Sequence, residues 1–179
     1  VRVAGGVATN GGGLFVTGAS SMLVLGGRVR VERNNASATG GGVSLGAGAR
    51  CEALDDTRLS LNTAGASGGG AYASGGALFI TDRVLVDANV APTTGAGLHL
   101  VEGASALISA SAAVVNSTSD VGGCVAASAS SFRMLGLTTL SNCSALTAGG
   151  GISATGSNVA LLNRSSVTGC KAKTGGGVY

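Results

Sequence analysis

Short runs in which apolar residues alternate with small or polar ones recur along the chain at a nearly constant interval. Each run follows a glycine-rich segment, and alternation of this kind is typical of a β-strand with one buried face. The glycine segments begin at Gly11, Gly40, Gly68, Gly95, Gly122, Gly149 and Gly175, at intervals of 29, 28, 27, 27, 27 and 26 residues. The pattern predicts strands at residues 14–16, 43–45, 71–73, 98–100, 125–127, 152–154 and 178–179.

Two further alternations keep the same period. Late in each repeat an apolar residue stands three positions before Asn or Cys, in the pairs Val31/Asn34, Leu59/Asn62, Val86/Asn89, Ala113/Asn116, Leu140/Cys143 and Val167/Cys170. A third alternation contains the pairs Leu23/Leu25, Leu78/Ile80, Phe132/Met134 and Val159/Leu161, with Cys51 and Ala53 in the same column. No stretch has the length or spacing of a crossover helix, so each repeat is predicted to be a coil of three short strands.

These patterns predict an all-β fold, a right-handed single-stranded parallel β-helix (solenoid) of about six coils of 26–29 residues. One coil cannot bury its inward residues alone, so neighbouring coils supply hydrogen bonds and contacts, and equivalent residues stack about 4.8 Å apart. The handedness is expected by analogy with known coils of this size. Residues 1–179 are expected to be one segment of a longer solenoid, because neither end has a polar cap.

Both recurring motifs are interpreted as structural corners rather than ligand sites. The glycines precede strands, where a tight turn with positive φ favours Gly. Asn tolerates left-handed backbone geometry, and stacked Asn side chains can form a ladder along the solenoid axis. The glycine segments recur in every coil and precede neither a helix nor a Lys, so they do not predict a phosphate-binding loop.

The combination of a glycine triplet, an apolar alternation and a later [Val/Leu]-x-x-Asn resembles the repeats of chlamydial polymorphic membrane proteins and related autotransporter-type β-helix adhesins, which contain GGA[ILV] and FxxN. The resemblance covers Gly11 to Tyr179. This chain has Gly where that family prefers Ala, Val or Leu where it prefers Phe, and Cys143 and Cys170 in place of the last two Asn. Similar repeats occur in surface proteins of algae and other protists. The resemblance implies a β-helix in a cell-surface protein.

Composition narrows the class of protein. The chain has 33 Gly, one Pro, 45% apolar and 11% charged residues, and the apolar content argues against the disorder that so many glycines would otherwise suggest. A net charge of +3 with no run of Lys or Arg predicts no nucleic-acid partner, and no outward column is expected to concentrate acids or bases. No apolar stretch approaches the roughly 20 residues of a membrane-spanning helix.

The cysteines and glycosylation sequons indicate a compartment. Cys143 and Cys170 stand in the same column of adjacent coils, so a disulfide between them is predicted, with Cys51 and Cys124 as unpaired apolar fillers and four reduced thiols as the alternative. Asn-X-Ser/Thr sequons occur at Asn35, Asn116, Asn142 and Asn163; Asn142 and Asn163 are the better acceptors, and Asn116 is expected to lie in the corner ladder. A disulfide with glycans would place the protein outside the cell or on its surface.

The sequence predicts no catalytic residue, metal ligand or cofactor. Asp55, Asp56 and Asp82 could adjoin on neighbouring coils near Arg58 and Arg83, but they are interpreted as solvated turn residues with weak local ion pairs. His99 has no second His and no carboxylate column beside it. A predicted outward column does gather aromatic residues, namely Phe15, Tyr72, His99 and Tyr179, which could contact a protein or glycan. A surface partly covered by loops or by a neighbouring subunit is the favoured alternative.

These observations favour a noncatalytic extracellular structural or adhesive scaffold, part of a cell-surface protein, appendage or filament. Its expected partners are further coils of the same chain or other subunits at both ends, and glycans. The alternative is a carbohydrate-active enzyme of the polysaccharide lyase or glycoside hydrolase kind, or a fragment of one, on analogy of fold alone. Ice binding would require an outward Thr ladder, which the aromatic column lacks.

Overall fold

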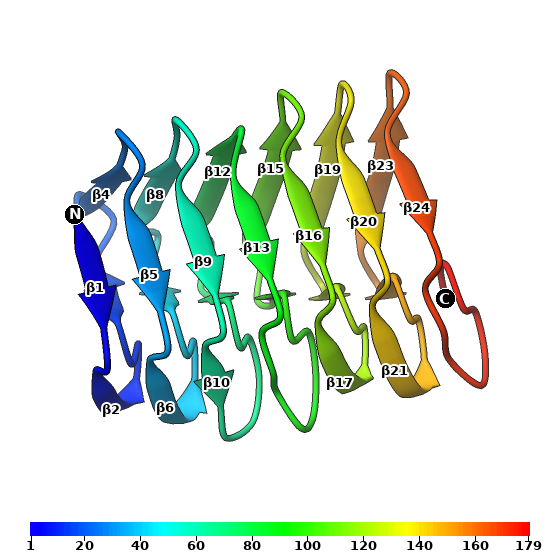
Figure 1. Ribbon diagram of the computed structural model, residues 1–179, viewed down its shortest axis with the longest axis horizontal. Coiled ribbons are helices and arrows are strands. Elements are labelled where there is room, and N and C mark those ends of the chain that lie inside the picture. Colours follow the sequence, from blue (N-terminus) through cyan, green and yellow to red (C-terminus); the bar gives the residue numbers. More distant parts are fainter.

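The computed structural model describes residues 1–179 and is an all-β parallel solenoid without helices (Figure 1). Every strand pairs in parallel with equivalent strands of neighbouring coils, and the chain makes about six coils. Along the axis from the N-terminus to the C-terminus, the near strands in Figure 1 run downward and the distant ones upward, which is the right-handed sense. The predicted fold class is confirmed.

Three long sheets, here named A, C and D, enclose the core, one for each strand predicted per coil. Sheet A contains β1 (Arg2–Ala4), β5 (Arg30–Glu32), β9 (Arg58–Ser60), β13 (Leu85–Asp87), β16 (Ala113–Val115), β20 (Thr139–Ser141) and β24 (Ser166–Thr168). Sheet C contains β3 (Leu14–Thr17), β7 (Val43–Gly46), β11 (Ala71–Ala73), β14 (Leu98–Leu100), β18 (Val125–Ser128) and β22 (Ile152–Thr155). Sheet D contains β4 (Met22–Leu25), β8 (Arg50–Ala53), β12 (Leu78–Asp82), β15 (Ser105–Ser109), β19 (Ser131–Leu135) and β23 (Asn158–Leu162).

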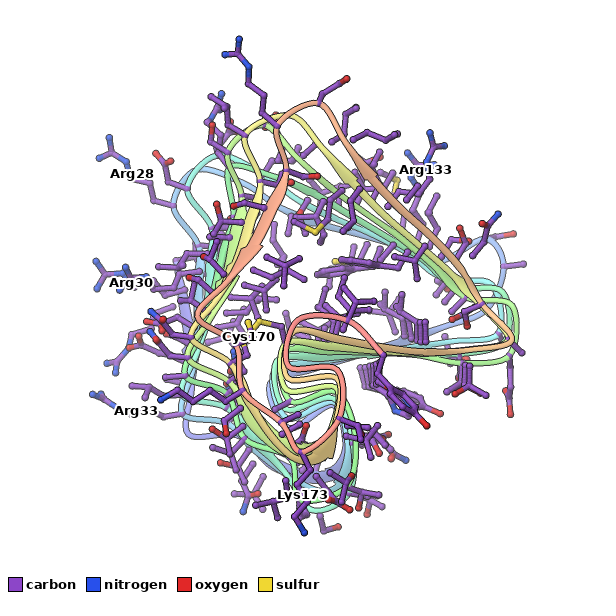
Figure 2. The ribbon with its side chains drawn as sticks, turned by 90° about the vertical axis from the view of Figure 1, so that its right-hand side faces the viewer. Arg28, Arg30, Arg33, Arg133, Cys170 and Lys173 are labelled. Atoms are coloured by element: carbon purple, nitrogen blue, oxygen red, sulfur yellow. A yellow bond between two sulfur atoms is a disulfide. The ribbon has the colours of Figure 1, made fainter.

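An outer lobe, which the sequence did not predict, projects between sheets A and C in each coil. Five coils place a short strand there: β2 (Val7–Asn10), β6 (Asn35–Thr39) and β10 (Thr63–Ala64) form one sheet, and β17 (Thr118–Val121) pairs with β21 (Ser144–Ala148). Figure 2 looks along the axis, with the lobe around Lys173 below the triangle of main sheets. Small side chains fill the lobe, with Ala64, Ala91 and Ala96 in a separate buried cluster. Alanine is only weakly apolar, so the strands of the lobe give little alternation that could be recognised in the sequence.

Stacked apolar columns form the core, as predicted. Parallel register places Val31, Leu59, Val86, Val114 and Leu140 directly over one another on the inner face of sheet A, where all are buried. The inner face of sheet D alternates large and small residues. Its column runs Leu23, Cys51, Phe79, Ala106, Phe132, Val159, so that each Phe packs against a smaller neighbour. Such alternation lets the side chains of neighbouring coils interdigitate.

Two predicted register positions were wrong by one residue. In β12, Phe79 and Thr81 point inward, whereas the predicted pair Leu78/Ile80 faces outward and is half-buried. This strand has apolar residues on both faces, so alternation alone does not determine which of them point inward. In β16, Val114 occupies the core column and Ser117 the corner, in place of the predicted Ala113/Asn116. Val114 and Val115 are adjacent and equally apolar, so the sequence pattern fits with either of them facing the core.

The predicted Asn ladder is present in three rungs, all buried: Asn34, Asn62 and Asn89. Asn62 Oδ1 accepts hydrogen bonds from the backbone N–H and the Nδ2 amide of Asn34, at 3.1 and 3.0 Å. Asn89 Oδ1 accepts the same two bonds from Asn62, at 2.9 and 3.1 Å. Each amide also donates to a carbonyl of the preceding coil, as from Asn62 to Val31 at 3.0 Å. The ladder therefore ties side chains to backbone across coils.

The backbone geometry at this corner differs from the prediction. Positive φ falls on the residue before each ladder Asn, at Arg33, Leu61 and Ala88, and not on the Asn itself. The ladder Asn is thus required for its buried hydrogen bonds rather than for left-handed tolerance. The glycine prediction is confirmed, because the first residue of every glycine segment has φ between 55° and 68°.

The disulfide joins Cys124 to Cys143, with Cα atoms 5.4 Å apart, so the predicted Cys143–Cys170 pairing was wrong. Cys51 and Cys170 are the free thiols. Cys143 and Cys170 do occupy equivalent places in adjacent coils, since the following residues Ser144 and Lys171 pair. The expectation of an unpaired apolar filler is confirmed for Cys51 and was wrong for Cys124. Burial raises the pKa of the Cys51 thiol to about 12.

Cys124 pairs with Cys143 because Cys124 occupies the third position of a glycine triplet. A Cβ at this position points toward the ladder residue that follows along the chain. At Gly42 and Gly70 it would lie 2.9 and 3.0 Å from the amide nitrogens of Asn62 and Asn89. An Asn rung therefore requires Gly opposite it. Where the rung is Cys143, the same close approach brings two sulfur atoms together.

Replacing Asn62 with Ala should lower the free energy of unfolding by about 2–4 kcal/mol, because it removes four buried hydrogen bonds and leaves the Asn34 N–H without its acceptor. Urea unfolding measures the change. The control is Asn158→Ala at an exposed position, where we expect a change within about 0.5 kcal/mol. Equal effects of the two substitutions would contradict a structural role for the ladder.

Candidate functional site

The outward face of sheet C carries the predicted aromatic column, and the lobe lies beside it. Register confirms the order Phe15, Ser44, Tyr72, His99, Ala126, Ser153, Tyr179 along the axis. A second column from the lobe runs Asn10, Thr39, Ser67, Thr94, Val121, Ala148, Thr174. The two columns face each other, since Thr94 and Val121 of the lobe line one hollow with His99, Ala126 and Ser153 of sheet C. The lobe shields part of the sheet, since Ser44 and Ser153 are buried although they face outward.

The structure brings together only two of the four predicted contact residues. The rings of Tyr72 and His99 lie edge to face, with centroids 5.6 Å apart and planes at 64°. Ser44 separates Phe15 from Tyr72, and two small residues separate His99 from Tyr179. Phe15 and Tyr179 are largely exposed, whereas Tyr72 and His99 are half-buried. The aromatic surface is therefore a local pair with two outlying members.

A hollow of about 400 Å³ adjoins this pair and is here named the sheet C groove. Its lining residues are Thr94, His99, Val101, Val121, Ala126, Ala127, Ser128, Ser153 and Thr155. The lining combines hydroxyl side chains with small apolar ones, and none of these residues carries a full charge at neutral pH. The groove therefore offers hydrogen bonds and apolar contact to a neutral, hydroxylated molecule.

His99 contributes a neutral imidazole to this groove. Burial lowers its pKa to about 4, because the charged ring would lose its hydration. Its Nδ1 lies 3.3 Å from the Thr94 hydroxyl oxygen, which is 2.7 Å from that of Ser67. The three residues form a chain of polar groups that leads from the groove to the buried Ser67. No carboxylate is hydrogen-bonded to the ring, so nothing raises its basicity for acid–base work.

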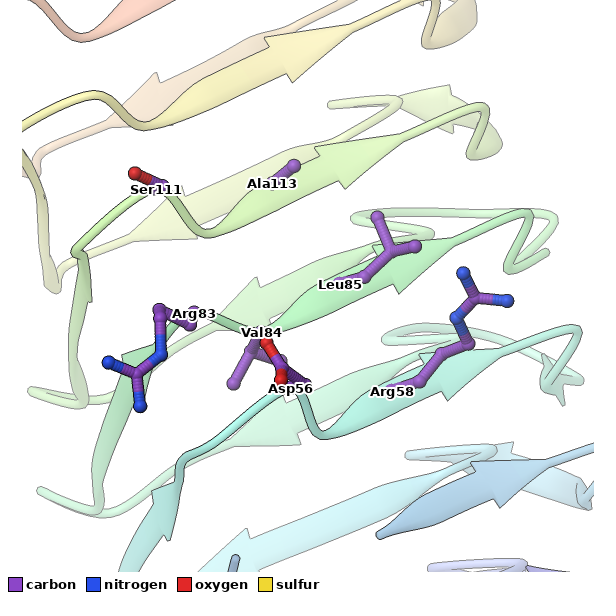
Figure 3. A pocket seen from close by; sticks show the side chains of 7 residues that line it. All are labelled: Asp56, Arg58, Arg83, Val84, Leu85, Ser111 and Ala113. Carbon is purple, nitrogen blue, oxygen red and sulfur yellow. The ribbon is translucent and has the colours of Figure 1, made fainter. Parts of the chain in front are cut away.

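A second hollow, of about 350 Å³, lies at the edge of sheet A (Figure 3). Asp56, Arg58 and Arg83 line it, with Leu85 and Ala113 nearby. Arg83 donates to Asp55 at 2.6 Å, and both side chains are more than half exposed, so the ion pair adds little stability. Asp82 is not among the lining residues. The three acids thus do not converge on one point.

The arginines do form an outward column, which corrects the expectation that no column concentrates charge. Parallel register stacks Arg2 on Arg30 and Arg30 on Arg58, on the outer face of sheet A. The signal was present in the sequence, because these residues are 28 positions apart and therefore one coil apart. A search for runs of basic residues misses a column of this kind.

All four sequon asparagines are exposed: Asn35, Asn116, Asn142 and Asn163. The expectation that Asn116 lies buried in the ladder was wrong, since Ser117 takes that place and the Asn116 amide donates instead to Asp87 Oδ1 at 2.8 Å. No group of three or more His, Cys, Asp and Glu side chains is close enough to hold a metal ion.

Comparison of the chain with known protein families, curated proteins and solved structures gave no match. The fold contains no helix that is long and apolar enough to span a membrane.

The single histidine provides a direct test of the groove. In the folded protein, the NMR signals of His99 should titrate with a pKa of about 4. Since the unfolded chain binds the proton near pH 6.5, the free energy of unfolding should decrease as the pH falls from about 6.5 to 4. His99→Gln should flatten this part of the stability curve. A titration near pH 6.5 in the native state would contradict the buried placement.

Proposed function

We propose that this protein is a noncatalytic structural or adhesive scaffold that contacts neutral glycans or glycosylated proteins through the sheet C groove. The observation that carries the proposal is the pairing of Tyr72 and His99 beside a groove of uncharged hydroxyl and apolar groups. Aromatic rings offer flat apolar contact and the hydroxyls offer hydrogen bonds, a combination that suits sugar rings.

The repeating backbone supports the scaffold role. Every coil is tied to its neighbours by parallel strand pairing, by the glycine segments and, in three coils, by the Asn ladder. A solenoid built in this way is stiff along its axis and presents equivalent positions at a regular spacing. The resemblance to repeats of surface adhesins agrees with this role.

An extracellular or cell-surface location forms part of the proposal. It is supported by the Cys124–Cys143 disulfide and by four exposed sequons. In protein isolated from its natural source, non-reducing peptide mapping should find the Cys124–Cys143 peptide pair and glycans on Asn142 or Asn163. Four free thiols with no glycan would contradict this location.

Blocking the groove should abolish glycan contact. Ser128 is exposed and lines the groove, so Ser128→Trp should fill it and reduce binding on an array of neutral oligosaccharides by about tenfold or more. Tyr72→Ala should reduce binding as well. Thr168→Trp, at an exposed position on sheet A, is the matched control and should bind like the unmodified protein.

The same experiment separates the scaffold from an enzyme. The bound oligosaccharides and polygalacturonate are incubated with the protein, and new reducing ends or unsaturated products are measured. A scaffold leaves every substrate intact. Cleavage that Ser128→Trp abolishes would overturn the noncatalytic proposal, and equal binding by all variants would overturn the role of the groove.

A further inference from the structure

The outer face of sheet A carries a cluster of arginines that the sheet C groove does not use. Arg2, Arg30 and Arg58 stack in register on β1, β5 and β9. Arg28 and Arg33 extend from the turns at the two ends of β5, and Figure 2 shows both of them with Arg30 projecting from one side of the solenoid. All five are exposed. We name these five residues the basic surface.

Most of this charge is unpaired. Only Arg2 has a carboxylate within ion-pair distance, at 2.6 Å from Glu32. Hydrogen bonding to Arg2, with the nearby charges of Arg33 and Arg30, lowers the pKa of Glu32, so this carboxylate stays ionised among several cations. Arg28, Arg30, Arg33 and Arg58 form no salt bridge. Like charges on adjacent strands repel, so the column carries an electrostatic cost that a bound anion would remove.

The geometry of the surface suits a linear ligand. Strand spacing sets the three stacked arginines about 4.8 Å apart along the axis. A guanidinium group forms paired hydrogen bonds with planar carboxylate or sulfate groups, which a chain with repeated anionic groups would present in turn. Beyond Arg58 the column continues as Leu85 and Ala113, so the row of stacked arginines ends there. These residues line the second hollow together with Asp56 and Arg83 (Figure 3).

We propose that the basic surface binds a linear anionic polysaccharide, laid along the solenoid axis across β1, β5 and β9. The face has no aromatic side chain, since the exposed rings belong to sheet C and Phe79 and Phe132 are in the core. Single-stranded nucleic acid is held largely by stacking on aromatic side chains, which favours a polysaccharide here. The site is separate from the sheet C groove, so it does not depend on the proposed function.

Affinity measurements with defined polymers test the proposal. Sulfated heparin and carboxylated polygalacturonate are the two probes, and their relative affinity identifies the preferred anion. We expect binding to at least one of them that weakens as salt rises from about 50 to about 200 mM. The double variant Arg30→Ala/Arg58→Ala should bind at least about tenfold more weakly.

The control removes the same charge elsewhere. Arg133→Ala/Arg164→Ala changes two exposed arginines outside the basic surface, and Arg133 projects from a different side in Figure 2. It should bind within about twofold of the unmodified protein, as should Ser128→Trp. An equal loss in the control would show that net charge alone attracts the polymer. Tighter binding of single-stranded DNA than of either polysaccharide, or no binding at low salt, would also overturn the proposal.

Discussion

In-register stacking of coils is the constraint on which the rest of this structure depends. Each strand obtains its hydrogen bonds from the coils before and after it, so a residue is always placed over its equivalent one period away. Any side chain must therefore tolerate a similar neighbour on both sides. Aliphatic residues do so by packing, and Asn does so by donating to one coil while accepting from the other.

The same constraint determines which side chains lie next to one another on the surface. Outward residues one coil apart become neighbours, so three arginines 28 residues apart form a charged column and Tyr72 lies against His99. The two surfaces differ in kind. Sheet A presents unpaired cations on an open face, whereas the sheet C groove is neutral and partly covered by the lobe. One solenoid thus presents two chemically distinct faces.

The corner of the Asn ladder shows how the fold accommodates a residue other than Asn. Ladder Asn side chains occupy the space opposite the third glycine of their triplets, so a side chain at that glycine would clash with the Asn. Ser117 ends the Asn ladder, and Cys143 then bonds to Cys124 across that space. A covalent bond replaces side-chain hydrogen bonds as the link at this corner, and a disulfide closing a loop of this length contributes about 3 kcal/mol in the chain-entropy model.

The sequence by itself determined the parallel coil, the three main sheets, the glycine turns, the Asn rungs and the outward aromatic column, because all of these repeat with one period. Only the tertiary structure decided the features that the repeat period does not determine. The parity of β12 depends on Phe79 stacking on Cys51, since its apolar residues fit either face. The partner of Cys143 depends on the direction of a Cβ across the coil, and the lobe depends on alanine packing with little pattern of its own. Equivalent positions along the axis follow from counting residues, whereas contacts across a coil require the path of the chain in space.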